Sequence, residues 1–241
     1  MSKTKKYKFK IKSRKIQLVA DKLLLLKLFK KLNGRFWGIY GLLMFIVFMA
    51  ICFIILPEYR DVSTAFSDFG TDIRTAPFFT AGLFFAGYGL WRWRNYLAKS
   101  SKIPGLVTLS ITGIIVGLYM VAFLPVGVND TVESLHYFGF ALAGVFMIST
   151  VMIDLLLRKT KKGKSQKKWQ IIRIFALLII IAGATVTALS ANRFGPVFNY
   201  ALIGESLLVL GFASWVIART YQPEGLQSGF SKVLNKILIV D

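Results

Sequence analysis

The sequence predicts an all-α polytopic membrane protein with six transmembrane helices, and three observations indicate this fold class. Hydrophobic residues make up 55% of the 241 residues and charged residues only 17%, whereas about 25% is usual in a soluble domain. The mean hydropathy is +0.60. The charges are gathered in short stretches between long apolar runs, and about 20 apolar residues cross a hydrocarbon core of about 30 Å.

The first three spans are predicted at about 36–56, 76–93 and 103–124. The first contains no charged residue. The second is the shortest, with 17 uncharged residues between Arg74 and Arg92, and its tryptophans suit the aromatic belt of a membrane interface. The third contains Gly113 and Gly117, a GxxxG spacing that allows close approach of a neighbouring helix.

The last three spans are predicted at about 135–157, 171–190 and 198–218. Asp154 lies at the end of the fourth, and we interpret it as an i,i+4 pair with Arg158. Glu205 is the only charged residue between Arg193 and Arg219 in the sixth. A carboxylate at that depth costs about 2–3 kcal/mol, so we expect it to face the bundle interior and either to have a partner or to be protonated.

Basic residues alternate between the links and predict the orientation. The first 35 residues hold 13 Lys or Arg, the link 91–102 holds four and the link 158–168 holds seven. The links 57–75 and 125–134 are mainly acidic. Because basic segments remain on the cytoplasmic side, we expect both termini to be cytoplasmic and the protein to be a multi-pass protein of the cell membrane.

The chain is predicted to have three parts. Residues 1–35 form a basic cytoplasmic tail, 36–218 the transmembrane domain and 219–241 a cytoplasmic amphipathic segment. Apolar residues at helical spacing predict flanking amphipathic helices in the membrane interface, at 25–32 and 230–238.

The net charge of +20 is not interpreted as nucleic-acid binding. A charge of +12 lies in the first 35 residues, and a basic tail beside apolar spans is typical of contact with anionic lipid headgroups at the cytoplasmic face. Membrane lipids are therefore the expected partners and nucleic acid is not. A protein partner or a homo-oligomer is left open.

The scarcity of ligating side chains excludes several kinds of site. With one His and one Cys, Cys52, the chain lacks the ligands of a bis-histidine haem, a cysteine-rich zinc site or an iron–sulfur cluster. No phosphate-binding, nucleophile-elbow or metalloprotease motif occurs. We expect no cofactor and no metal.

The remaining polar residues are all expected near the outer face, where three links meet. Asp68, His136 and Glu205 are the candidate catalytic residues. The candidate ligand-binding residues are Ser67, Asp68, Asp72, Arg74, His136, Arg193 and Glu205.

The stretch "AFSDFGTDIRTAPFF", at 65–79, is predicted to fold back over the outer mouth of the bundle. Ser and Asp offer side-chain oxygens for local turns and Gly permits positive φ. Asp68 would then form a polar cluster with His136 and Glu205. It would either cap the helix at 76–93 or accept a hydrogen bond from His136.

Several short motifs resemble those of a known family. "SDFG" at 67–70, "FFTAGL" at 78–83, "FLPVG" at 123–127, "LHYFGFALAG" at 135–144 and "GESLLV" at 204–209 are similar to elements of the domain-of-unknown-function family 998 of prokaryotic membrane proteins. An Arg that often follows the glutamate in that family is Ser206 here. The Frag1/DRAM/Sfk1 group is a neighbouring resemblance. The resemblance implies six helices and points to Asp68, His136 and Glu205, but it implies no activity.

Three functional hypotheses follow. The first is an outward-facing polar pocket that binds a lipid headgroup or a small polar ligand. The second is a metal-independent membrane lipid hydrolase or transferase that uses Asp68, His136 and Glu205. The third is a structural or accessory subunit of a membrane complex, in which the polar residues only lock helices together.

Overall fold

The computed structural model describes residues 34–61, 63–99, 105–157, 164–191 and 199–221. Within these ranges every regular element is helical. Three 3₁₀ helices are η1 (Gly34–Phe36), η2 (Pro57–Arg60) and η3 (Phe66–Gly70). The α-helices are α2 (Trp37–Ile55), α3 (Ala76–Lys99), α4 (Gly105–Phe123), α5 (Asp130–Leu157), α6 (Lys164–Ala191) and α7 (Ala201–Tyr221). The amphipathic helices predicted at 25–32 and 230–238 lie outside the described residues.

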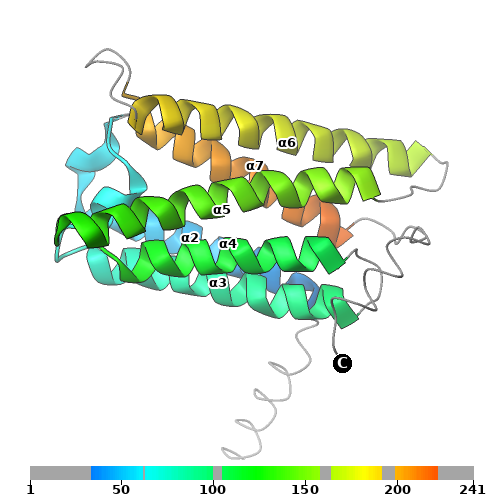
Figure 1. Cartoon of the computed structure of the whole chain (residues 1–241), viewed down its shortest axis with the longest axis horizontal. Helices are drawn as coiled ribbons and strands as arrows, with labels where there is room; N and C mark the ends of the chain where they lie inside the picture. Colours follow the sequence, from blue (N-terminus) through cyan, green and yellow to red (C-terminus); the bar gives the residue numbers. More distant parts are fainter. Residues whose placement is uncertain (1–33, 62, 100–104, 158–163, 192–198, 222–241) are drawn as a thin grey trace, which may run out of the picture. The chain divides into compact units, whose positions relative to one another are not determined.

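Consecutive helices pair most closely, so that α2 packs on α3, α4 on α5 and α6 on α7 (Figure 1). Glycines allow each close approach, because a Cβ at these positions would collide with the facing backbone. A Cβ on Gly117, in the predicted GxxxG, would lie 2.5 Å from the carbonyl oxygen of Gly139. The close packing predicted from that spacing is confirmed. The other facing pairs are Gly41 with Gly89 and Gly183 with Gly204.

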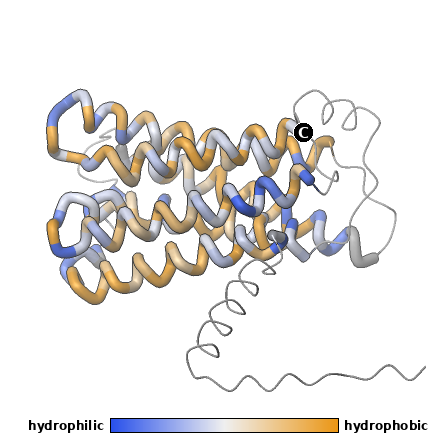
Figure 2. The backbone as a smooth tube through the Cα atoms, turned by 90° about the horizontal axis from the view of Figure 1, so that it is seen from below, coloured by the Kyte–Doolittle hydropathy of each residue, from blue (hydrophilic) through white to orange (hydrophobic). Residues whose placement is uncertain are grey.

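Five helices of the described chain are long and apolar enough to cross a membrane, namely α2 together with η1, α4, α5, α6 and α7. Figure 2 shows the hydrophobic residues concentrated along the middle of the helices and the hydrophilic ones toward the ends. The α6 helix also presents a continuous apolar face, in which Ile171 and Phe175 are each 64% exposed. Such a surface is typical of lipid contact and unusual in water.

The second predicted span corresponds to α3, which is 24 residues long but is not among these five. Its glycines, tryptophans and Arg92 lower its hydropathy. Much of its surface is covered by protein, since residues such as Leu90 and Trp93 are almost completely buried. A helix surrounded by its neighbours needs fewer apolar residues than one surrounded by lipid.

Two helices begin earlier than predicted. The helix expected at 135 begins at Asp130, where Asn129 caps it by accepting a hydrogen bond from the Val132 N–H at 2.9 Å. The helix expected at 171 begins at Lys164. In both cases a charged stretch that the sequence predicts to be a link is helical instead. Lys and Glu are good helix formers outside the lipid.

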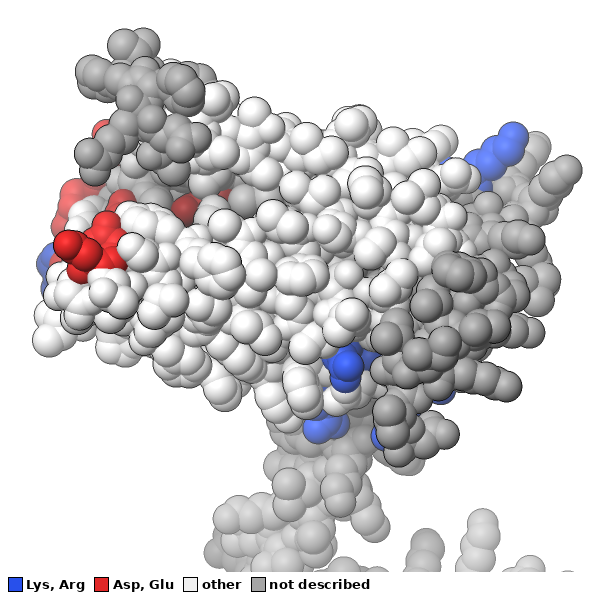
Figure 3. Space-filling view, in the orientation of Figure 1, with Lys and Arg blue, Asp and Glu red and all other residues white. Residues whose placement is uncertain are grey.

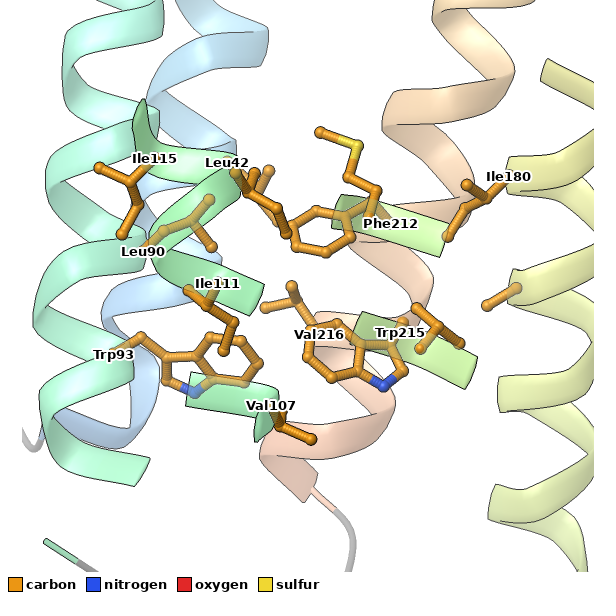
Figure 4. Packing of buried hydrophobic residues seen from close by; sticks show 14 of the residues in the cluster. Leu42, Leu90, Trp93, Val107, Ile111, Ile115, Ile180, Phe212, Trp215 and Val216 are labelled. Atoms are coloured by element: carbon orange, nitrogen blue, oxygen red, sulfur yellow. The ribbon is translucent and has the colours of Figure 1, made fainter. Parts of the chain in front are cut away.

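The centre of the described bundle is a hydrophobic core of mainly aliphatic side chains, with the rings of Trp93, Phe212 and Trp215 among them. Figure 4 shows side chains from several helices interlocking there. The rings of Trp93 and Trp215 meet edge to face with centroids 5.4 Å apart, at an interplanar angle of 78°. Both tryptophans are 0% exposed, so this contact joins α3 to α7 across the core.

Candidate functional site

The segment between α2 and α3 is anchored to the bundle by aromatic side chains. Phe69 of η3 is 0% exposed, and its ring lies 4.8 Å from that of Phe53, edge to face. The buried Thr75 hydroxyl donates to the carbonyl oxygen of Phe69 at 2.8 Å, which fixes the turn that leads into α3. The segment therefore lies folded against one end of the described bundle.

Asp68 stabilises this segment locally. Its Oδ2 accepts a hydrogen bond from the Ala65 N–H at 2.8 Å, across the first turn of η3. In the described part of the chain Asp68 neither caps α3 nor accepts a hydrogen bond from His136. Its effect is to hold Phe66 and Ser67 in a tight turn.

Glu205 receives its partner from this turn. The backbone N–H of Phe66 donates to Oε2 of Glu205 at 2.5 Å, and Glu205 is only 7% exposed. Its other oxygen, Oε1, makes no hydrogen bond with the described residues. The Asp68 carboxylate also acts on Glu205 electrostatically. The structure thus brings Asp68 and Glu205 to the same end of the bundle through the turn at Phe66.

His136 is held separately. It is 2% exposed, and its Nδ1 lies 2.6 Å from the carbonyl oxygen of Leu124. A carbonyl can only accept, so Nδ1 carries the proton, and in the neutral ring Nε2 is an acceptor. Nε2 makes no hydrogen bond with the described part of the chain.

A cavity of about 90 Å³ lies between α2, α3, α4, α5, α7 and η3. Among the described residues that line it, Glu205 is the only charged one and Ser67 the only other polar one. The apolar lining comprises Leu42, Phe45, Phe66, Phe79, Leu83, Ala86, Leu90, Leu118, Val121, Phe140, Ala143, Gly144, Met147, Leu208, Val209 and Phe212. We call this the main cavity.

A second cavity, of about 270 Å³, adjoins the first and is more polar. His136 and Thr80 line it, and the two cavities share Ser67, Phe79 and Val121. Its remaining lining residues are Gly70, Ala76, Ala122, Phe123 and Pro125. We call this the His136 cavity. Of the predicted site residues, Ser67, His136 and Glu205 thus line two neighbouring cavities.

Asp72 and Arg74 do not line either cavity. Arg74 is exposed and donates to Asp72 from Nε at 3.0 Å and from Nη2 at 2.7 Å; it also lies 3.7 Å from Glu58. Hydrogen bonds from the Arg74 side chain lower the pKa of Asp72 from 3.8 to about 2. This is a surface ion pair. Arg193 lies outside the described residues.

A second buried polar cluster lies toward the other end, and sequence reasoning missed most of it. Asp154 is 0% exposed, and its Oδ2 lies 3.1 Å from Nη1 of Arg173. Trp215 donates from Nε1 to the same oxygen at 3.1 Å, and Nε of Arg219 lies 3.6 Å from Oδ1. Asp154 therefore joins α5 to α6 and α7. Arg158, the partner predicted from the sequence, lies outside the described residues.

Acidic and basic side chains on the described surface lie mainly at opposite ends of the bundle. In Figure 3, Asp and Glu side chains gather at one end of the visible face and most Lys and Arg side chains lie toward the other. The acidic end is the one that carries η2 and η3.

Among the described residues, no three His, Cys, Asp or Glu side chains come together as they would around a metal ion. The comparisons with known proteins add no relative. No family model matches the chain, and neither a curated protein nor a solved structure gives a significant match. The resemblance of its motifs to family 998 stays a prediction.

Proposed function

We propose that the protein spans the cell membrane six times, with both termini in the cytoplasm, and binds the alkyl chain of a membrane amphiphile in the main cavity. The observation that carries this is the lining of that cavity, which is apolar except at the end where Glu205 and Ser67 lie. An apolar cavity with one polar end suits an amphiphile, because the alkyl chain contacts the apolar lining while the head group makes hydrogen bonds at the polar end.

The orientation rests on the charges. The acidic end of the described bundle carries η2 and η3, whereas basic residues lie at the other end, in the last turns of α3 (Arg92, Arg94 and Lys99) and the first turns of α6 (Lys167 and Lys168). By the positive-inside rule the acidic end is outside. The amphiphile then enters from the outer leaflet, with its head near Glu205.

This proposal modifies the hypothesis of a polar pocket for a small polar ligand, since most of the lining is apolar. The catalytic hypothesis has less support. No two of Asp68, His136 and Glu205 share a hydrogen bond in the described structure, and each is held by a backbone group instead. The experiment below distinguishes binding of an alkyl chain in the main cavity from a purely structural role of these residues.

Gly144 offers a way to fill the cavity without disturbing the fold. It lines the main cavity, and a Cβ added there would meet no atom within 4 Å. Gly144→Leu therefore places a side chain in open space, and the better helix propensity of Leu favours the folded state by about 0.8–1 kcal/mol. Val145→Leu is the matched control, because Val145 is the next residue and is 60% exposed.

The test uses the purified full chain in lipid nanodiscs and a long-chain alcohol that carries a photoreactive diazirine at mid-chain. We expect crosslinks on the cavity faces of α5 and α7, reduced about tenfold by Gly144→Leu, which corresponds to about 1.4 kcal/mol, and unchanged by Val145→Leu. Crosslinks confined to the outer apolar face of α6, and equal in all three proteins, would mean that the cavity takes no chain.

A further inference from the structure

The polar atoms at the end of the main cavity are hydrogen-bond acceptors. Glu205 is more than nine-tenths buried and lines the cavity. Its Oε2 already accepts the N–H of Phe66, which leaves Oε1 as the oxygen that meets a ligand. A carboxylate has only acceptor atoms. A head group beside the ionised Glu205 therefore donates.

The His136 cavity also presents hydrogen-bond acceptors. Because Nδ1 donates to the carbonyl oxygen of Leu124, the neutral ring offers Nε2 as an acceptor. The Thr80 hydroxyl likewise donates to the carbonyl oxygen of Ala122 at 3.2 Å, so its oxygen lone pairs remain for an incoming donor. Ser67, on the wall between the cavities, makes no hydrogen bond with the described residues and can either donate or accept.

Cations are missing from the described lining of both cavities. Neither lining includes a Lys or an Arg, and Arg74, at the same end of the bundle, is exposed and paired with Asp72 and Glu58. A carboxylate or phosphate head would thus face Glu205 without a described cation to offset the repulsion. In a site with little water this repulsion is strong.

We propose that the two cavities form one composite site for an amphiphile whose head group donates hydrogen bonds, either a primary ammonium or a hydroxyl group. Glu205 and Ser67 bind the head where the chain leaves the main cavity. A head with several donors, such as a polyol or an amino alcohol, extends past Ser67 to Nε2 of His136. The inference rests on the proposed function, because the chain must occupy the main cavity.

The experiment compares three photoreactive probes that share one chain and differ in the head: a primary amine, a glycerol monoether and a carboxylic acid. We expect the wild-type protein to crosslink the amine and the glycerol probes at least about tenfold more than the acid, the range that a hydrogen bond to a charged group contributes. Glu205→Gln keeps an oxygen for the Phe66 N–H and removes the charge, so the amine should lose its advantage over the acid. Glu58→Gln removes an exposed acid at the same end and should change nothing.

A matched pair of variants separates the two ring nitrogens of His136. The amide nitrogen of His136→Asn reproduces the Nδ1 donor to Leu124 and removes the acceptor at Nε2, whereas His136→Gln places an oxygen near the Nε2 position. We expect His136→Asn to reduce crosslinking of the glycerol probe several-fold and His136→Gln to reduce it less. Equal losses in both variants, for all three heads, would show that His136 only supports the fold.

The outcomes distinguish this inference from the proposed function. Three probes that crosslink equally in the cavity would leave chain binding intact and overturn the donor-head proposal. A preference for the acid that Arg193→Ala abolishes would also overturn it and would assign head-group binding to that arginine. If none of the probes crosslinks in the cavity, the proposed function itself fails.

Discussion

Oδ2 of Asp154 and Nη1 of Arg173 lie 3.1 Å apart, although both side chains are almost completely buried. With Trp215 and Arg219 on the same carboxylate, this pair is the polar connection between α5 and the hairpin of α6 and α7. Besides this pair, α6 and α7 make few close contacts with α5 in the described bundle. The pair therefore joins the α6–α7 hairpin to α5 within the described bundle.

Asp154→Asn should destabilise the protein by about 3–5 kcal/mol, the usual cost of removing one partner of a buried ion pair. The physical reason is that two buried arginines lose the carboxylate that offsets their charge. Thermal unfolding of the purified protein in detergent, followed by tryptophan fluorescence, measures the change. Asp72→Asn is the control, because that carboxylate belongs to an exposed pair and should leave unfolding almost unchanged. Equal melting of both variants would show that the buried cluster contributes no more than a surface pair.

Phe69→Ala should loosen the segment that covers the cavities. The ring is fully buried against Phe53, and removal of such a side chain costs about 3–5 kcal/mol. Hydrogen exchange of residues 63–75 should become faster, while exchange in α6 stays as it was. Ile73→Ala is the matched control in the same segment, because Ile73 is 88% exposed. Faster exchange in both variants, or in neither, would argue against the anchoring role of the ring.

The orientation can be tested by cysteine labelling in a Cys52→Ala background. Thr71 and Lys167 are both exposed, and the basic-residue alternation predicts that they lie on opposite sides of the membrane. In intact cells an impermeant thiol reagent should label Thr71→Cys, and it should label Lys167→Cys only after the membrane is opened. The reverse pattern would place both cavities on the cytoplasmic side.

The pair of Asp72 and Arg74 predicts a pH dependence confined to acid. Because the pKa of Asp72 is lowered to about 2 in the folded protein, its contribution to stability is complete above about pH 4 and is lost as the pH falls through about 2. Arg74→Ala should return the carboxyl toward its ordinary value of 3.8, which an NMR titration of labelled aspartate side chains would show. No effect of this pair on stability is expected between pH 5 and 8. An Asp72 carboxyl that titrates near 4 with Arg74 in place would contradict the hydrogen bonds described here.

The sequence predicted the helical architecture well, because a helix that crosses lipid must bury its backbone polar groups and needs a long apolar run to do so. It could not predict the longer starts of α5 and α6, since charged residues outside the apolar layer are compatible with either helix or link. The helix α3, predicted as the second span, shows a different limit. Its hydropathy is weaker, and the neighbouring helices that bury Leu90 and Trp93 cannot be recognised from the local sequence.

Partners of buried charges were harder to predict than their positions. Glu205 was expected to have a partner or to be protonated, and among the described residues its hydrogen-bond partner is the backbone N–H of Phe66, which lies 139 residues earlier. Every residue except proline has such a donor, so nothing in the sequence marks this one. Arg173 did carry a signal, as a charge within an apolar run, but its partner Asp154 lies on another helix.

The pairing of helices by facing glycines bears on the order in which the chain matures during synthesis. Each pair, α2 with α3, α4 with α5 and α6 with α7, brings its own close backbone contact and can therefore assemble as it leaves the ribosome. Glu205, Arg173 and Arg219 all lie on the last pair. Until that pair docks, Asp154 lacks these two arginines, and the main cavity lacks the one acid among its described lining residues. A chain that stalls after α5 thus keeps Asp154 without the two arginines that contact it in the complete protein.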